Sequence, residues 1–338
     1  MPHTILLTGG SGYLGQHVLT ELLQSSPRSQ IRVVDLRPAP FPSADIEADP
    51  RVEQYLEVDI LDEEKLAPLF EGVDQVVHMA SAISYSVKDR AWLESMNIWG
   101  TRIIASLALS HGVKRLVNIS SMAALGYNDD PHAPVDESFR FDWKIARRQR
   151  KYYMLTKHLG DQEVALVQAR GLNAVTIYPG LLFGPGNGVL AFKLIRAIRA
   201  GKIPFNLPGG INVVDVRDVA RGIAAVVTGD IRNGKFLFTG RNLTYQELNS
   251  VIASQVNVSP PRRTLPRLLR SPLYGLLVPV EWLARKRLDM TAEILSSGFI
   301  YRYYDNGQAA ASLGWKPRIP LPQTIADTLA WMEAHAIA

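Results

Sequence analysis

Short apolar runs alternate with longer segments of helical periodicity along the first half of the chain. The apolar runs predict strands at residues 4–7, 31–35, 52–59, 75–79, 115–120 and 174–178. The helical patterns lie at residues 12–24, 63–70, 92–111 and 153–170. Alternation of this kind is typical of an α/β fold, in which helices cover both faces of a doubly wound parallel sheet. Buried parallel strands form continuous apolar runs, as RLVNIS and AVTIY do.

The pattern changes after Pro179. Loops rich in Gly and Pro separate short elements, and a strand followed by a helix returns near residues 211–228. We therefore expect a first domain at residues 1–180, joined by that returning unit, and a smaller, mostly helical lobe within residues 181–338. The two parts are expected to interleave in sequence.

The composition supports a folded globular protein, because 47% of the 338 residues are hydrophobic and 20% are charged. The chain has no cysteine, which excludes disulfides, thiolate catalysis and cysteine-bound metals. No metal site is predicted. The first residues lead directly into a strand and lack the pattern of a signal peptide, and no apolar stretch is long enough to span a membrane. A cytoplasmic location is the default expectation.

A glycine-rich turn, TGGSGYLG, links the first predicted strand to the first predicted helix. Gly9 permits the tight turn, Gly12 lets backbone N–H groups approach a pyrophosphate, and Gly15 allows close packing of helix and strand. Tyr13 and Leu14 belong to the same loop and are included among the cofactor-binding residues. Because an apolar strand precedes the loop and an amphipathic helix follows it, the segment predicts a Rossmann-type dinucleotide site.

The residues that follow the next two strands refine the choice of cofactor. Asp35 ends the second strand and is placed to accept hydrogen bonds from a ribose, which favours NAD over NADP. Arg37 could meet a 2′-phosphate, so NADP stays open. Asp59 and Ile60 are placed to contact the adenine, and Asp59 could equally cap a helix.

Tyr153 and Lys157 are four residues apart and share one face of a predicted helix. A phenol has a pKa of about 10, and a nearby ammonium would favour the phenolate. The pair therefore predicts proton transfer beside the dinucleotide. His78 lies in an apolar strand and is interpreted as a hydrogen-bonded core residue rather than a catalytic base.

Ser120 and Ser121 end a strand at the edge where open α/β sheets place ligands. A hydroxyl there could hold a substrate oxygen, or it could cap the strand end. No Gly-x-Ser-x-Gly segment surrounds either serine, which argues against a nucleophilic role.

The ordered motifs resemble those of the extended short-chain dehydrogenase/reductases. They are TGGSGYLG, VVDLR, VDI, HMASA, MNIWGT, NISSMAALG, YYMLTK and YPGLLFGPG, and they cover residues 4–188. A weaker likeness continues through VVDVRDVA and YDNGQAAASLGWKPR. The resemblance implies that Tyr153 is the acid/base, that Lys157 lowers its pKa and binds the nicotinamide ribose, and that Ser121 positions the carbonyl, with Ser120 as the alternative. It also implies cofactor contacts from Asn97, Tyr178 and Pro179. The small residues Ala80, Ser81 and Ala82, which follow His78, make room for a cofactor and are included among the cofactor-binding residues.

Departures from the family pattern bear on the substrate. Leu181 stands where sugar-nucleotide enzymes of the family carry Asn, and Ser121-Met122-Ala123 replaces the Thr-Asp-Glu of the dehydratases. The chain looks closer to the 3β-hydroxysteroid dehydrogenase and dihydroflavonol reductase branch. We therefore expect a secondary alcohol or ketone on an apolar ring, with Ile83, Leu181 and Ser121 at the substrate. The alternatives are a sugar-nucleotide epimerase and a non-enzymatic dinucleotide sensor.

The net charge is +5, and two local basic clusters stand out in the sequence. The first is Arg140, Lys144, Arg147, Arg148, Arg150 and Lys151, and the second is Arg262, Arg263, Arg267, Arg270, Arg285, Lys286 and Arg287. They could be solvated helix faces, or they could meet an anionic substrate and a membrane surface respectively. No nucleic-acid motif accompanies them. The resemblance implies a homodimer, through the helices predicted at residues 92–111 and 153–170.

Overall fold

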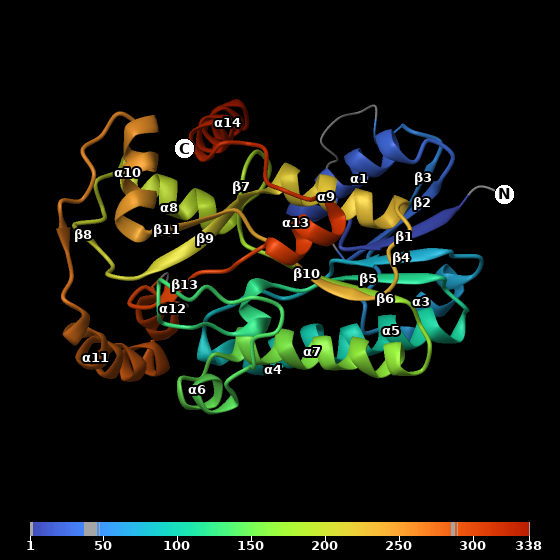
Figure 1. Cartoon of the computed structure of the whole chain (residues 1–338), viewed down its shortest axis with the longest axis horizontal. Helices are drawn as coiled ribbons and strands as arrows, with labels where there is room; N and C mark the ends of the chain where they lie inside the picture. Colours follow the sequence, from blue (N-terminus) through green and yellow to red (C-terminus); the bar gives the residue numbers. More distant parts are fainter. Residues whose placement is uncertain (1–2, 37–45, 47, 285–287, 289, 338) are drawn as a thin grey trace.

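The main sheet has seven parallel strands in the order β10-β6-β5-β4-β1-β2-β3 (Figure 1). The computed structural model describes residues 3–36, 46, 48–284, 288 and 290–337. The strands are β1 Thr4–Thr8, β2 Gln30–Asp35, β3 Val52–Leu56, β4 Gln75–His78, β5 Arg115–Ile119, β6 Ala174–Pro179 and β10 Gly234–Phe238. The strand order reverses between β1 and β4, so the carboxyl ends of these strands border the crevice where ligands bind in such sheets. The predicted doubly wound fold is confirmed.

Helices cover both faces of this sheet, as the amphipathic patterns require. On one face α1 and α9 pack together, and on the other α5 lies beside α7 (Figure 1). The helices of the main layer are α1 Tyr13–Ser25, α3 Glu63–Leu66, α4 Arg90–Glu94, α5 Thr101–Ser110, α7 Tyr152–Ala169, α9 Val216–Thr228 and α13 Gly307–Leu313. Each face of the sheet has its own apolar core.

The second lobe is built around a small sheet as well as helices. Its strands are β7 Leu181–Phe183, β8 Phe205–Asn206, β9 Gly210–Asp215, β11 Arg241–Thr244, β12 Arg263–Thr264 and β13 Tyr301–Arg302. Its helices are α6 Trp143–Arg148, α8 Val189–Arg199, α10 Tyr245–Gln255, α11 Arg270–Leu283, α12 Ala292–Ser297 and α14 Leu321–Ala334. Strand β9 pairs with β7, β11 and β13, and a separate apolar core fills this lobe.

The strand predicted to return near residue 211 does not join the main sheet. It is β9, and it pairs with β7 in the smaller sheet, whereas the helix after it, α9, does return and packs against α1. The strand that rejoins the main sheet is β10, which pairs in parallel with β6. A fully buried apolar strand carries no signal of which sheet it enters, so the sequence pattern could not separate the two.

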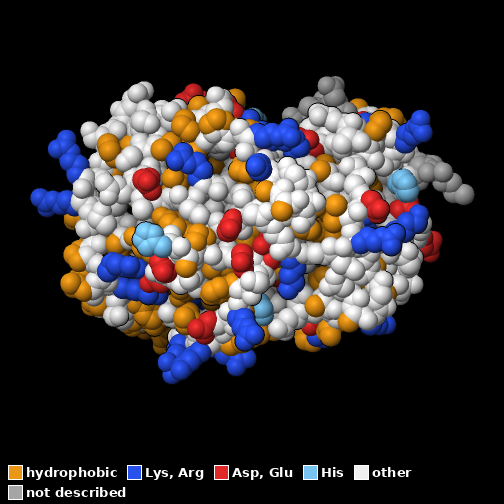
Figure 2. Space-filling model, in the orientation of Figure 1, with side chains coloured by type: hydrophobic (Ala, Val, Ile, Leu, Met, Phe, Trp, Pro, Cys, Tyr) orange, Lys and Arg blue, Asp and Glu red, His pale blue; other side chains and the backbone are white. Residues whose placement is uncertain are grey.

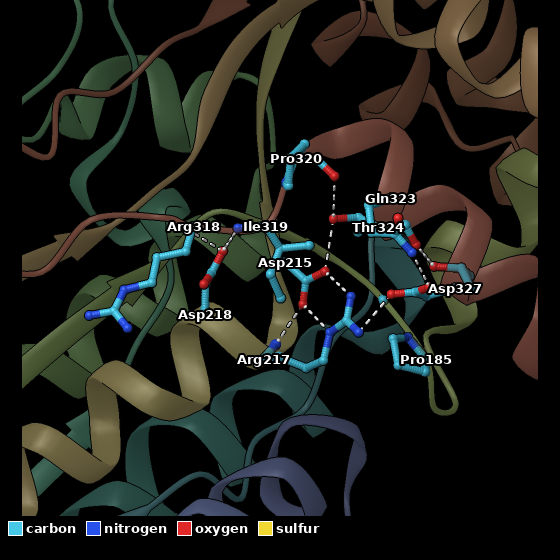
Figure 3. Close-up of polar contacts among 12 residues, drawn as sticks. Pro185, Asp215, Arg217, Asp218, Arg318, Ile319, Pro320, Gln323, Thr324 and Asp327 are labelled. Atoms are coloured by element: carbon cyan, nitrogen blue, oxygen red, sulfur yellow. Dashed lines mark hydrogen bonds and ion pairs between the residues drawn. The ribbon is translucent and has the colours of Figure 1, made fainter.

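A polar junction fixes the C-terminal segment to the start of α9 (Figure 3). Asp215 caps α9, pairs with Arg217 at 2.7 Å and accepts a hydrogen bond from Thr324 at 2.8 Å. Asp218 accepts backbone hydrogen bonds from Arg318 and Ile319, both at 2.9 Å. Both carboxylates are buried, so these partners compensate the cost of removing two charges from water.

The helix predicted at residues 92–111 is interrupted. A π-helical turn, Ser95–Gly100, separates α4 from α5. Such turns occur often at functional sites, because they re-aim side chains within a helix. Here the turn contains Asn97, whose side chain is buried near the predicted cofactor position.

His78 is a core residue, as its apolar strand predicted. The imidazole is 3% exposed and lies between the hydroxyls of Thr8, at 2.7 Å, and Thr101, at 3.1 Å. Burial and, secondarily, the charge of Lys157 lower the pKa of His78 to about 3. The ring therefore stays neutral at working pH and links β1, β4 and α5.

Replacement of His78 should make the fold less sensitive to acid. The folded-state pKa lies below the ordinary value of 6.5, so between these values the unfolded chain binds one proton more than the folded protein. This contribution to stability is present above pH 6.5 and is lost as pH falls toward 3. Relative to His78→Asn, the wild type should lose roughly 1 kcal/mol of unfolding free energy per pH unit below 6. Urea unfolding at several pH values measures this difference, and equal slopes would contradict it.

Candidate active site

The glycine loop adopts the conformation that a dinucleotide site requires. Gly9 has φ of +72°, and a Cβ there would lie 2.7 Å from the backbone nitrogen of Ala80. A Cβ on Gly15 would lie 2.3 Å from the carbonyl oxygen of Gly9. The loop, the start of α1 and the end of β4 are therefore packed backbone to backbone, and side chains are excluded from two of the three glycine positions.

Tyr13 directs its side chain away from the tip of the loop. Its hydroxyl donates to the carbonyl of Gly184 at 3.0 Å, and its ring covers Gly186 and Gly188. The side chain thus fastens the start of α1 to the loop that follows β7. Cofactor contacts by the backbone of Tyr13 and Leu14 stay predictions.

Asp35 lies at the end of β2 beside the glycine loop. One carboxylate oxygen accepts a hydrogen bond from the backbone N–H of Ser11 at 3.1 Å. The carboxylate is thereby held next to the turn that would receive the pyrophosphate, in the position that favours a ribose diol. Arg37 lies outside the described residues.

The residues predicted at the adenine and nicotinamide ends border the same crevice. Asp59 is partly exposed and bonds to the backbone of Leu61, and Ile60 is buried against Gly100. Ala80 is partly exposed, Ser81 is exposed and Ala82 is buried.

Asn97 holds the segment Ala80–Ala82 in place through hydrogen bonds to Ala82. Its amide oxygen accepts from the backbone N–H of Ala82 at 2.8 Å, and its amide nitrogen donates to Ala82 and to Thr156 on α7. The side chain is therefore occupied by protein contacts, which tie the cofactor-side loop to the helix that carries Tyr153.

Tyr153 and Lys157 face the carboxyl end of β5, as the helical spacing predicted. Both side chains are buried, with exposures of 7% and 6%. The ammonium of Lys157 donates to the carbonyl of Ile119, the last residue of β5, at 3.0 Å. Burial lowers the pKa of Lys157 to about 8, and the Asp161 carboxylate opposes this shift.

The pKa of Tyr153 differs from the sequence-based expectation. Burial raises it, a hydrogen bond with Ser121 acts in the opposite direction, and Asp161 adds to the rise. Lys157 is not among the groups that shift it, and the Lys157 ammonium donates to the carbonyl of Ile119. In this structure Tyr153 is a neutral phenol at pH 7, which suits a proton donor.

Ser121, rather than Ser120, meets the tyrosine. It follows β5 and caps the short turn Met122–Leu125, where its hydroxyl accepts from Ala123 N–H at 3.2 Å. Ser120 is also buried, and its hydroxyl acts to lower the pKa of Asp161, although its Oγ has no hydrogen-bond partner within the described residues. The side chains of Ser121 and Tyr153 are thus placed to share one substrate oxygen.

Asp161 is a member of this site that the sequence interpretation missed. It lies one turn beyond Lys157 on the same face of α7, and it accepts from the side chain of Asn118 at 3.1 Å. Burial raises the pKa of Asp161 to about 6, and Lys157 acts against the rise. The four-residue spacing from Lys157 was the available signal. Tyr178, fully buried in β6, also contacts this carboxylate, and Pro179 ends the same strand.

Tyr85 extends the site toward the smaller lobe. Its ring meets the ring of Tyr153 edge-on, with centroids 5.7 Å apart. Beyond it lie three charged groups that interact with one another, Lys151, Glu293 and Arg302. Lys151 is 3% exposed and donates to Ser297 at 2.7 Å. It therefore differs from the basic residues that precede it in the first cluster, which are exposed. We call these three residues the buried charge cluster.

Arg302 is the member of the cluster with unused hydrogen-bonding capacity. Its terminal nitrogen donates to Tyr245 at 2.9 Å, whereas its buried Nε has no hydrogen-bond partner within the described residues. Burial lowers the pKa of Lys151 and raises that of Glu293, and each charge opposes the shift of the other. No sequence pattern could have indicated this cluster, since its members come from separate segments.

The two predicted substrate contacts differ in their surroundings. Ile83 is 55% exposed beside Ala82, whereas Leu181 is partly buried and packs on the apolar core of the smaller lobe. Leu181 therefore presents an apolar surface after β6, with no hydrogen-bonding group.

The fold and the site together define a dinucleotide-dependent enzyme. Residues 5–236 match the family model described as the NAD dependent epimerase/dehydratase family, so the chain belongs to that family. The predicted extended short-chain relationship and the expected NAD cofactor are thereby confirmed.

Individual relatives include steroid and flavonoid enzymes. The chain is 27% identical to 3beta-hydroxysteroid-dehydrogenase/decarboxylase isoform 2 of Arabidopsis thaliana, covering 96% of this chain but 61% of that relative. It is 26% identical to the putative dihydroflavonol 4-reductase of a Synechocystis strain, over 99% of this chain and 96% of the relative. The dTDP-glucose 4,6-dehydratase DesIV of Streptomyces venezuelae, solved with NAD and TYD bound, has the same fold with a TM-score of 0.76 at 22% identity, over 98% and 97% of the chains.

A methyl group on Gly15 should damage the nucleotide site. In Gly15→Ala the added carbon meets the Gly9 carbonyl, so we expect a loss of about 1–3 kcal/mol in stability and at least a tenfold weaker affinity for NAD. Gly275→Ala is the control, because no atom lies within 4 Å of its Cβ position in helix α11. Melting curves and NAD titration measure both effects. Unchanged NAD affinity in Gly15→Ala would contradict the assignment of the loop.

Proposed function

We propose that the protein is an NAD-dependent oxidoreductase that interconverts a secondary alcohol and a ketone on an apolar, ring-containing substrate. The observation that carries the proposal is the arrangement of Tyr153, Ser121 and Lys157 at the end of β5, beside the glycine loop and the Asn97-anchored segment.

Each residue has a distinct role in the proposed reaction. NAD, when bound, accepts or donates the hydride. Ser121 and Tyr153 would bind the substrate oxygen, and Tyr153, kept neutral by burial, would donate its proton to that oxygen during reduction. Lys157 holds α7 against β5, and its ammonium adds positive charge where negative charge develops on the substrate oxygen. The Asp161 carboxylate raises the pKa of Lys157 against the effect of burial, and so favours the charged form of the lysine.

An apolar substrate is supported by what surrounds the catalytic group. Leu181 offers no hydrogen bond to a diphosphate, and Tyr85 covers one side of Tyr153 with an aromatic ring. The names of the steroid and flavonoid relatives agree with this substrate class. A sugar-nucleotide epimerase is the alternative within the same family.

The buried charge cluster favours a second, more specific candidate, a substrate that also carries a carboxylate. The unpartnered Nε of Arg302 and the Lys151 ammonium could receive it. Oxidation of a hydroxyl on the carbon β to a carboxylate gives a β-keto acid. Its carbon–carboxylate bond then breaks, the electron pair passes to the ketone as an enolate that takes up a proton, and CO₂ leaves. The plant relative is named a dehydrogenase/decarboxylase.

We further propose a cytoplasmic homodimer formed through α5 and α7. The exposed side chains of Trp99, next to α5, and Leu166, on α7, support this choice of surface.

Tyr153→Phe should lower turnover by about a hundredfold to ten-thousandfold, because the proton donor is removed while the ring remains. The melting shift produced by NAD should persist. Tyr152→Phe is the matched control, since the Tyr152 ring packs under Arg90 instead of against Ser121, and its turnover should stay within about twofold of wild type. Hydride transfer is followed by NADH absorbance. Retention of most of the activity in Tyr153→Phe would sink the proposal.

A thermal-shift panel in the presence of NAD should separate the substrate classes. We expect stabilisation by a steroid alcohol and stronger stabilisation by its carboxylate-bearing analogue, but none by a UDP- or dTDP-sugar. Arg302→Met should reduce the preference for the carboxylate by at least about tenfold, while Arg241→Met, an exposed arginine on β11, should not. Stabilisation by sugar nucleotides alone would favour the epimerase, and an unchanged preference in Arg302→Met would remove Arg302 from the site.

A further inference from the structure

Helix α11 has its polar and apolar sides reversed relative to a helix of a water-soluble protein. Leu276, Val280 and Leu283 form one stripe at i, i+4 and i+7, and they are 64%, 46% and 72% exposed. Trp282 beside them is 70% exposed. The one fully buried side chain of the helix is that of Glu281. We call Leu276, Val280, Trp282 and Leu283 the α11 apolar face.

Polar contacts hold the inner side of α11 on the protein. The carboxylate of Glu281 accepts backbone hydrogen bonds from Val87 and Ala292, both at 3.1 Å. Tyr274, seven residues earlier on the same side, donates to the carbonyl of Gln149 at 3.4 Å. These polar contacts hold the inner side of the helix, while Leu276, Val280, Trp282 and Leu283 are left exposed.

Basic side chains lie on α6, whose following turn meets α11, and on the segment that precedes α11 in the chain. Helix α6 and the turn after it meet α11 through Gln149, which also accepts from Arg270 at 3.3 Å. In Figure 1 α6 and α11 lie at the same end of the molecule, and Figure 2 shows hydrophobic atoms gathered there with Lys and Arg groups beside them. The exposed basic residues, which we call the basic rim, are Lys144, Arg147, Arg148, Arg150, Arg262 and Arg263. Arg267, also nearby, is paired with Asp129.

The active-site segment is attached to the same helix. Val87, bonded to Glu281, follows the segment that contains Ile83 and Tyr85, and Tyr85 packs on Tyr153. Lys88 also donates to the carbonyl of Ala284 after the end of α11. Helix α11 is therefore bonded, through its buried side, to the segment that leads to Tyr85 and Tyr153.

We propose that the α11 apolar face and the basic rim dock the protein on the surface of an anionic lipid bilayer. No helix in the described part of the chain could cross a membrane, so the contact is interfacial. Exposed apolar side chains that include a Trp, with cations nearby, match the two forces that bind peripheral proteins. These forces are burial of apolar area among the acyl chains and attraction to anionic headgroups.

Vesicle sedimentation tests the proposal on the full-length protein. We expect binding to phosphatidylcholine vesicles that contain about one quarter phosphatidylglycerol, and binding at least about tenfold weaker to pure phosphatidylcholine. Leu276→Glu combined with Leu283→Glu should weaken binding to the anionic vesicles by at least about tenfold, as should Arg147→Glu combined with Arg148→Glu. Val189→Glu, which alters a 56% exposed apolar residue at the start of α8, should bind like wild type.

Two further measurements separate this proposal from the others. Hydride transfer on a water-miscible ketone without vesicles should be unchanged in every variant. Membrane docking can therefore fail while the proposed enzymatic function stands, and the enzymatic function can fail while membrane docking stands. Light scattering gives the mass of each protein in solution. Membrane docking would be overturned if the wild type did not bind anionic vesicles, or if the Leu276→Glu with Leu283→Glu variant bound them equally well. It would also be overturned if that double variant changed the oligomer mass, a result that would indicate an interface between two copies of the protein.

Discussion

The contact between the Lys157 ammonium and the Ile119 carbonyl sets the position of everything at the site. Burying a lysine is costly, so its partner must lie at a fixed place, and that place is the last residue of a central strand. Helix α7 is thereby held in one axial register against β5. Tyr153, one turn earlier, then meets Ser121, the second residue after the strand. A shift of α7 by one residue would separate the phenol from the serine and leave the ammonium without its acceptor.

The protein distributes charge and apolar surface in an unusual way at its second lobe. Lys151, Glu293 and Glu281 are buried, whereas four apolar side chains of α11 face outward. Each buried ionisable group has protein partners, so the lobe tolerates them. Around α11 and α12, polar contacts join the elements, whereas the apolar core of the lobe lies elsewhere, among β9, α8, α10 and α14.

The sequence predicted the main fold and the chemical centre because both depend on short-range spacing. The glycine loop, the Tyr153–Lys157 interval and the carboxyl-edge position of Ser121 are local patterns that the sheet topology brings together. The sheet membership of β9, the low exposure of Lys151 and the place of Arg302 depend on tertiary contacts between distant segments, which no periodicity encodes. The direction of the Tyr153 pKa was wrong for a similar reason, since spacing indicates which charge is near but not how much water remains or where the ammonium points.

The junction at Asp215 and Asp218 links the order of synthesis to the order of folding. These carboxylates belong to the middle of the chain, but their partners include Thr324 and the backbone of Arg318 and Ile319. While the ribosome is still making residues 229–317, α9 can form, but the two carboxylates at its start lack part of the environment that makes their burial tolerable. The first lobe therefore reaches its final stability only after the last helix has emerged, even though nearly all of its strands were made much earlier.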